Sequence, residues 1–367
     1  MASSEVLCVG EVLWDSLPSG LFLGGAPFNV ACHLRAAGVP VSLVSRVGAD
    51  RLGEEAVRRV ARYGVGTDLV QVHPELPTGF VRVSVSEDGD ASYEILAPAA
   101  WDAIAATEQL LARAAAARAI VFGSLAQRAP ESRATIERLW ETDALLVFDP
   151  NLRPPDDDVR VVRRSLERAA MVKVTVRELR QLARWFELPG GTNANVPLLR
   201  TVAALAETFH CHTVCVTRGR DGAALWRDGR WAEHPGFEVE VRDTVGTGDA
   251  FLAVLLAGLL SGADDQAALH HASLMGAYVA TQTGAVPPDQ PSPFAPPRRP
   301  SPGAAAAGAP GSASGSASGT ASASASRAPS RRTGRLTAVR AVIPDGYALR
   351  PTMSWTLDVG VPRSPRG

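Results

Sequence analysis

The sequence predicts an α/β fold with a central, mostly parallel sheet. Short apolar runs that end at glycine or at a polar residue alternate with longer segments of helical periodicity, and this alternation is typical of parallel βαβ units. A glycine-rich turn near Gly246 leads into a helix that is apolar on nearly every side, which predicts that this helix is buried. With 367 residues and a hydrophobic fraction of 46%, the chain can form a sizeable core.

The predicted elements follow one another in a regular order. Glycines mark several boundaries: Gly38 ends the first predicted helix, and Gly64 follows the second. We expect strands at 5–11, 41–47, 119–122, 145–149, 171–174 and 213–217, and a hairpin at 223–226 and 231–233. We expect helices at 30–37, 52–63, 110–118, 130–141, 161–169, 177–186, 198–209 and 266–283, and the buried helix begins near Asp249.

Residues 78–97 interrupt this pattern. Apolar residues alternate with arginine and serine from Phe80 to Ser86, an acidic turn follows at 87–90, and a second extended run returns at 92–96. This pattern predicts an antiparallel hairpin. The hairpin could decorate one edge of the main sheet, or it could form a small lid over a site that must exclude water.

Composition excludes some classes of partner. The 37 basic and 38 acidic residues give a net charge of −1, so we expect no general attraction to nucleic acid or to a membrane surface. The four cysteines follow no disulfide or zinc spacing, which favours a reducing, cytoplasmic location. The apolar helix after Asp249 is shorter than the roughly 20 residues that cross a bilayer.

The pattern of strands and helices stops near Pro287. Residues 291–333 are mostly proline, alanine, serine, glycine and arginine, and such a composition buries too little apolar surface to offset the entropy of ordering the chain. Residues 336–361 contain only scattered apolar side chains. We therefore expect one domain at 1–290 and a low-complexity, disordered tail at 291–367.

The segment Asp243-Thr244-Val245-Gly246-Thr247-Gly248-Asp249 carries the strongest chemical signal. Its glycines allow a sharp turn that presents backbone N–H groups, and the positive end of the following helix dipole adds to an anion site. A carboxylate beside an anion makes sense if Asp249 accepts the proton of a hydroxyl that attacks a phosphoryl group. The simpler interpretation is a tight turn into a core helix.

Two further groups of polar residues accompany this segment. Asp15, Gly24, Gly25 and Asn29 suit a site that holds adjacent hydroxyl groups, although the glycines could form a plain loop and Asn29 could cap a helix. Residues 149–153, Asp-Pro-Asn-Leu-Arg, follow a strand at the edge where open α/β sheets bind ligands. A strand-end turn fixed by proline explains this last segment equally well.

These segments together resemble the signatures of the ribokinase-like, or PfkB, carbohydrate kinases, and above all those of fructokinases. Residues 243–249 match the family's Asp-Thr-x-Gly-Ala-Gly-Asp except at Thr247, residues 10–31 resemble its sugar-binding signature, and residues 149–153 resemble its Asp-x-Asn-x-Arg. The likeness covers most of the chain outside the tail. It implies a three-layer α/β/α fold with a small β-hairpin lid, and it favours the lid interpretation of residues 78–97.

The resemblance also implies a role for individual residues. Sugar would be held by Asp15, Gly24, Gly25, Asn29 and Arg153. Catalysis would involve Asp249 as the base and Gly246, Thr247 and Gly248 as the anion hole. ATP would lie along Thr217, Gly219, Gly222, Thr244, Gly246 and Gly248. Glu178, in a segment where Thr175 replaces the family's asparagine, would act on Mg²⁺ through water. A K⁺ ion beside the anion loop and a homodimer formed through the lid are implied as well.

The sequence therefore predicts an ATP-dependent sugar kinase that phosphorylates a primary hydroxyl. Fructose, giving fructose 6-phosphate, is the first expected acceptor. Ribose, a nucleoside or 2-keto-3-deoxygluconate are alternative acceptors. A kinase-like binding or scaffold protein with weak catalysis is the alternative from another class.

Overall fold

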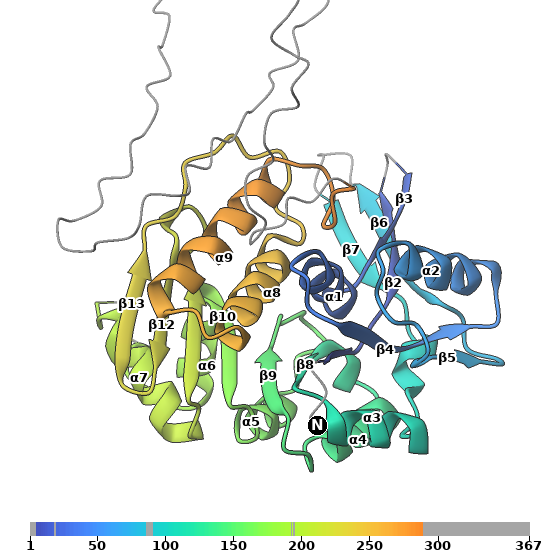
Figure 1. The fold of residues 1–367 in the computed structure, drawn as a ribbon, viewed down its shortest axis with the longest axis horizontal. Helices are drawn as coiled ribbons and strands as arrows, with labels where there is room; N and C mark the ends of the chain where they lie inside the picture. Colours follow the sequence, from blue (N-terminus) through green and yellow to red (C-terminus); the bar gives the residue numbers. More distant parts are fainter. Residues whose placement is uncertain (1–4, 18–19, 86–90, 192, 194, 289–367) are drawn as a thin grey trace, which may run out of the picture. The chain divides into compact units, whose positions relative to one another are not determined.

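The computed structural model describes residues 5–17, 20–85, 91–191, 193 and 195–288 (Figure 1). The predicted tail at 291–367 and the acidic turn at 87–90 lie outside these residues. In the described part of the chain, the main sheet has nine strands in the order β13-β12-β11-β10-β9-β8-β1-β4-β5. Its strands are β1 (Val6–Val9), β4 (Val41–Gly48), β5 (Val70–His73), β8 (Ala119–Gly123), β9 (Leu145–Asp149), β10 (Met171–Thr175), β11 (Thr213–Thr217), β12 (Ala223–Arg227) and β13 (Arg230–His234).

Within the described residues, neighbouring strands are parallel from β11 to β5, whereas β12 runs antiparallel to both β11 and β13 at one edge. The strands are apolar on both faces because helices cover both. In β1, for example, Val6 and Cys8 pack into one core, whereas Leu7 and Val9 pack into the other. The predicted fold class is confirmed.

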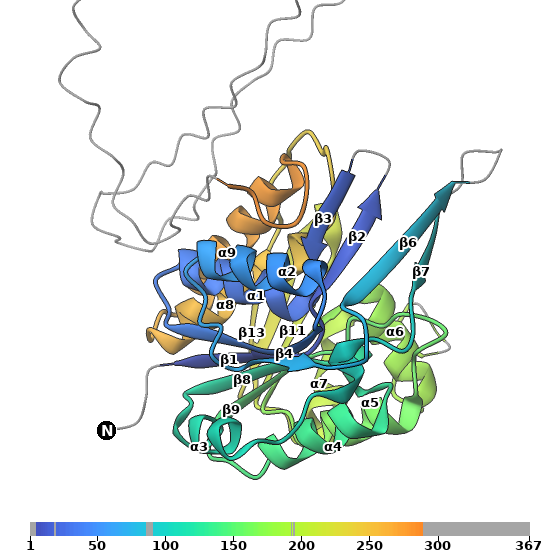
Figure 2. The ribbon, with the colours of Figure 1, turned by 90° about the vertical axis from the view of Figure 1, so that its right-hand side faces the viewer.

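Figure 2 shows the two helical layers on opposite faces of the sheet. One layer contains α1 (Ala26–Ala36), α2 (Arg51–Arg62), α8 (Thr247–Leu260) and α9 (Asp265–Ala280). The other contains α3 (Glu108–Ala116), α4 (Pro130–Leu139), α5 (Val159–Leu166), α6 (Val176–Trp185) and α7 (Leu198–Phe209). Helix α8 is the buried helix that the sequence predicts, and its residues from Asp249 to Gly258 are all buried. Among the described residues, no helix combines the length and apolarity that a membrane crossing requires.

A separate four-stranded sheet, β3-β2-β6-β7, forms the lid. The predicted hairpin supplies β6 (Gly79–Val85) and β7 (Ala91–Ile95), which pair antiparallel. Two strands that the sequence does not reveal, β2 (Leu13–Leu17) and β3 (Gly20–Gly24), complete the sheet, with β2 parallel to β6. The hairpin is therefore not an edge of the main sheet. In Figure 2 the lid strands project from one end of the main sheet.

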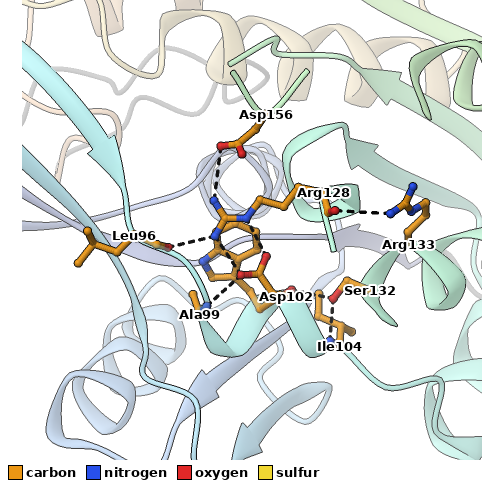
Figure 3. Close-up of polar contacts among 9 residues, drawn as sticks. Leu96, Ala99, Asp102, Ile104, Arg128, Ser132, Arg133 and Asp156 are labelled. Carbon is orange, nitrogen blue, oxygen red and sulfur yellow. Dashed lines mark hydrogen bonds and ion pairs between the residues drawn. The ribbon is translucent and has the colours of Figure 1, made fainter. Parts of the chain in front are cut away.

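Arg128 binds the segment that leads from the lid back to the main domain (Figure 3). Its guanidinium donates to both carboxylate oxygens of Asp102, at 2.8 and 2.9 Å, and to the carbonyl of Leu96, at 3.0 Å. The guanidinium also lies over the ring of Trp101, 4.1 Å from its centroid. Only 10% of the Arg128 side chain and 8% of the Asp102 side chain are exposed. A buried, bidentate ion pair thus holds the chain that follows β7.

We expect Arg128→Met to lower the free energy of unfolding by about 3–5 kcal/mol, because it leaves the carboxylate of Asp102 buried without its partner. Urea denaturation followed by circular dichroism measures this change. The matched variant Arg128→Met/Asp102→Asn removes the unpaired charge and should recover much of the loss. Equal stability of the wild type and the single variant would show that this ion pair does not hold the lid exit.

Candidate active site

The predicted anion loop forms the N-terminus of α8. Gly246 is the N-cap residue and has a left-handed φ of 76°. A Cβ at this position would overlap the Cβ of Ala285 and lie 2.5 Å from its Cα, so only glycine fits. Asp243 fixes the turn on two sides by accepting the N–H of Val245 and that of Gly284, both at 3.0 Å. Since the first N–H groups of a helix lack partners within it, this rigid turn can bind an anion.

Thr247 occupies the position where the family signature has alanine. Its hydroxyl donates to the carbonyl of Thr244 at 2.9 Å. The hydroxyl is thus held inside the turn, and the extra side-chain atoms complete a local hydrogen bond. Thr244 itself is exposed at the surface of the loop.

Asp249 lies in the first turn of α8 and is 8% exposed. Its Oδ2 accepts a hydrogen bond of 2.8 Å from Nδ2 of Asn29, a residue 220 positions away. Asn29 is not a helix cap, because Gly25 is the N-cap residue of α1 and Asn29 lies within the helix. The structure therefore brings the predicted base and one predicted sugar-binding residue into direct contact.

Asp15 approaches the glycines that lead from β3 into α1. A Cβ on Gly24 would overlap Oδ2 of Asp15, and a Cβ on Gly25 would overlap the carbonyl oxygen of Glu11. Both glycines are therefore required for the close approach of these segments. Burial raises the pKa of Asp15 to about 6, and the charge of Arg153 acts in the opposite direction.

Two charged residues of the site were not singled out from the sequence. Glu11 is 4% exposed, and its Oε1 accepts the N–H of Ala26 at 3.2 Å. Burial raises the pKa of Glu11 to about 7, and the charge of Asp249 adds to this effect. Lys173, in the centre of β10, donates to Oδ2 of Asp149 at 2.8 Å. A lysine inside an otherwise apolar strand was the one signal that could have identified it.

The segment after β9 is held by a capping arrangement at the start of α6. Glu178 accepts the N–H and the hydroxyl of Thr175, both at 2.8 Å, with Oε2, and the N–H of Leu152 at 2.9 Å with Oε1. The Thr175–Glu178 pair is thus a capping box for α6. Arg153 follows in an exposed position, and its N–H donates to Asp157 at 2.6 Å. Whether Glu178 also acts on Mg²⁺ stays a prediction.

The predicted nucleotide loop follows β11. Thr217 ends this strand, and Gly219 has a φ of 61° with open space on the side where a Cβ would lie. Gly222 is different, since a Cβ there would overlap the backbone of His234 and Gly236. Gly219 therefore leaves room for a ligand, whereas Gly222 is needed for packing against the end of β13.

Two cavities adjoin at Ser124, near the carboxyl ends of the parallel strands. The smaller, of about 20 Å³, is lined in part by Glu11, Asp149 and Asn151. The larger, of about 190 Å³, lies beside Arg128 and Asp156. One cavity thus lies next to the buried carboxylates, and the other lies beside the lid exit.

A separate lid sheet, a glycine turn at the start of α8 and a carboxylate in the first turn of that helix are the features expected of a small-molecule kinase. The sequence model of the family described as pfkB family carbohydrate kinase matches residues 20–292. The chain belongs to this family, and the predicted resemblance is confirmed.

Known relatives and solved structures agree with this membership. The fructokinase of Klebsiella pneumoniae is 27% identical over 304 residues, which cover 77% of this chain and 95% of that protein. The ATP-dependent ribose-1-phosphate kinase of Halopiger xanaduensis is 28% identical, with coverage of 71% and 81%. An uncharacterised sugar kinase of Pyrococcus horikoshii superposes with a TM-score of 0.65 at 26% identity, covering 77% of this chain and 94% of that one.

Two solved structures with bound nucleotide share the fold. A fructokinase of Xylella fastidiosa with bound ATP has a TM-score of 0.65 at 24% identity, with coverage of 77% and 94%. An Escherichia coli protein assigned as a ribokinase II, in complex with ATP and Mg²⁺, has a TM-score of 0.66 at 22% identity, with coverage of 77% and 95%.

Proposed function

We propose that this kinase transfers a phosphoryl group from ATP to a primary hydroxyl of a sugar, with fructose as the first candidate acceptor. One observation carries the proposal: Asp249 lies beside the anion loop at the start of α8 and contacts Asn29 at 2.8 Å. A proton acceptor and an anion site thus share one helix turn, which is the arrangement that phosphoryl transfer to an alcohol requires.

The comparisons support the choice of acceptor and of nucleotide. Several relatives of similar identity are fructokinases, from Klebsiella pneumoniae, Escherichia coli and Salmonella typhimurium among others. The ribose-1-phosphate kinase of Halopiger xanaduensis is about as similar, which supports a ribose derivative as an acceptor. Ribose, a nucleoside and 2-keto-3-deoxygluconate remain alternative acceptors. The structures with bound ATP, one of them with Mg²⁺, support ATP and Mg²⁺ as ligands.

Each group of predicted site residues has its own role in the proposed reaction. Asp15, Gly24, Gly25, Asn29 and Arg153 hold and orient the sugar. Asp249 then accepts the proton of the reacting hydroxyl, and the N–H groups of Gly246, Thr247 and Gly248 stabilise the charge on the moving phosphoryl group. Thr217, Gly219, Gly222 and Thr244 bind along ATP, with Gly222 keeping the loop in shape. The lid excludes water, which would compete with the sugar as acceptor.

The charged residues fit a magnesium ion at this site. Oδ1 of Asp149 is buried and has no hydrogen-bond partner within the described residues. The charge of Glu178 acts on Asp149, so Glu178 supplies a second carboxylate close to it. These two groups would hold the water shell of Mg²⁺, which neutralises the phosphates when it is bound. A K⁺ ion beside the anion loop and a dimer formed through the lid stay predictions, which potassium titration and analytical ultracentrifugation would test.

A sugar panel tests the proposed function. ATP consumption is measured with fructose, ribose, a nucleoside and 2-keto-3-deoxygluconate, with and without Mg²⁺. We expect turnover that requires Mg²⁺ and is fastest with fructose. Faster turnover of another acceptor would correct the substrate. Binding of sugar and ATP without turnover of any acceptor would favour the kinase-like binding protein instead.

Sugar binding should weaken at low pH because the pKa of Asp15 lies at about 6. Below this pH the carboxylate becomes protonated and loses the charge that attracts hydroxyl donors, so the KM for the sugar should rise about tenfold between pH 7 and pH 5. The matched variant Asp15→Asn cannot titrate at this position. It should have a high KM at both pH values and a smaller rise between them. The same rise in both proteins would assign the effect to Glu11 or to Asp149.

A further inference from the structure

Lys173 lies against the first turn of α8, although it belongs to the centre of β10. It is 4% exposed, and its ammonium donates to Oδ2 of Asp149 at 2.8 Å. A Cβ on Gly248 would lie 3.0 Å from Nζ of Lys173 and 3.7 Å from Cε. The ammonium thus occupies the space beside Gly248, one of the residues whose N–H groups form the anion loop.

This packing gives one physical reason for the glycine at the second position of α8, because a Cβ there would press on the ammonium. Glycine at a helical position is less favourable than alanine by about 1 kcal/mol. Gly248 has an αR backbone within the helix and needs no left-handed φ. The atoms that lie close to the place of a Cβ on Gly248 are those of the Lys173 side chain. Absence of a side chain at Gly248 therefore lets a cation reach the anion loop.

Three carboxylates keep this cation charged. Burial alone would lower the pKa of a lysine, but the charges of Asp149, Asp249 and Glu178 outweigh burial and raise it. The positive end of the α8 dipole also repels the ammonium. The three carboxylates outweigh this repulsion as well, so a positive charge is held beside the first turn of α8.

The ion pair with Asp149 does not by itself explain why a lysine is buried at position 173. Replacing a buried ion pair by well-packed apolar residues is often neutral or stabilising, so such a pair is weak evidence of a role in stability. An ammonium has three donors, and Asp149 is its one hydrogen-bond partner among the described residues. Two of its donors therefore have no partner among the described residues, and the ammonium lies beside Gly248.

We propose that Lys173 is a catalytic residue whose ammonium contacts the phosphoryl group as it moves from ATP to the acceptor. The inference rests on the proposed function. In that step the bond between the γ-phosphorus and the bridging oxygen breaks, and its electron pair stays on ADP. A bond forms between the sugar oxygen and the same phosphorus, and the hydroxyl proton passes to Asp249. Lys173 keeps its protons and supplies charge beside the N–H groups of Gly246–Gly248.

The test compares binding of ADP with binding of ADP plus aluminium fluoride, which mimics the moving phosphoryl group, by calorimetry with Mg²⁺ and fructose present. The variants are Lys173→Met and the double variant Lys173→Met/Asp149→Asn, which leaves no buried unpaired carboxylate if the single variant fails to fold. Asp149→Asn alone is the matched control for the double variant.

We expect the aluminium fluoride complex to bind about 100-fold more weakly to the double variant than to Asp149→Asn, because removing one donor from such a site costs about 10²–10³ in rate. ADP alone should bind the two proteins within about threefold of each other. Equal loss of both affinities, or a fall in Tm with unchanged affinities, would overturn the proposal in favour of a structural role.

The same data separate this inference from the proposed function. A wild type that phosphorylates a sugar and prefers the aluminium fluoride complex, together with a double variant that keeps this preference, overturns the role of Lys173 alone. A wild type that turns over no sugar and shows no such preference overturns both.

Discussion

Replacing Asp249 with asparagine should lower kcat for sugar phosphorylation by about 10²–10⁴, because the hydroxyl then loses its general base. The geometry should persist, since the carbonyl oxygen of the new side chain can still accept the hydrogen bond that Asn29 now donates to Oδ2 at 2.8 Å. The dissociation constant of the sugar, measured by calorimetry, should therefore stay near that of the wild type. Steady-state kinetics and calorimetry together check this result.

A matched control for this variant is Asp264→Asn. Asp264 is the N-cap residue of α9, where its side chain accepts the N–H of Ala267 at 2.9 Å, and asparagine caps helices equally well. The control should keep its activity. An Asp249→Asn protein with wild-type kcat would refute the role of Asp249 as base, and a protein that no longer binds the sugar would show that Asp249 mainly holds the substrate.

Gly246→Ala should both destabilise the protein and abolish most of its turnover. An alanine there must adopt a left-handed φ and also displace Ala285, whose Cα would lie 2.5 Å from the new Cβ. Strain and overpacking together should lower the free energy of unfolding by about 2–5 kcal/mol. The shifted turn would also move the N–H groups of the anion loop, so we expect kcat to fall at least about 100-fold.

Gly262→Ala separates the two causes. Gly262 follows the other end of α8 with a φ of 82°, and nothing lies within 4 Å of the place of a Cβ. The control should therefore lose only the 1–2 kcal/mol or so of left-handed strain and keep its kcat. If Gly246→Ala behaved like this control in urea denaturation and in turnover, the close packing on Ala285 would not fix the anion loop.

Buried parallel strands were predicted well because each is a short, continuous apolar run with a clear end. The strands at 145–149 and 213–217 and the helix at 198–209 have the predicted bounds. In contrast, the lid was only half predicted. Strands β2 and β3 have five residues each, and β2 pairs with β6 across more than 60 positions of sequence, from Leu13 to Gly79. No local pattern reports such a pairing.

The residues of the candidate site were likewise only partly predicted from the sequence. The glycine turn at the start of α8 and the position of Asp249 could be predicted because one stretch of seven residues contains the turn, its glycines and this carboxylate. Lys173 and Glu11 were not identified, because the residues next to each of them in the sequence do not show which charged groups they contact in the fold. The partner of Lys173 is Asp149, 24 residues away on the neighbouring strand.

By itself the sequence determined the α/β class, the order of its main elements and the glycine turn at the start of α8, because apolar periodicity and glycine turns act over a few neighbouring residues. Only the tertiary structure decided that Asn29 touches Asp249, that Lys173 reaches the loop past Gly248, and that the lid has four strands. Those contacts join residues far apart in the chain, and they depend on how α1, α8 and β10 pack. The raised pKa values of Glu11 and Asp15 follow from the same packing, because burial removes the water that would otherwise stabilise their charge.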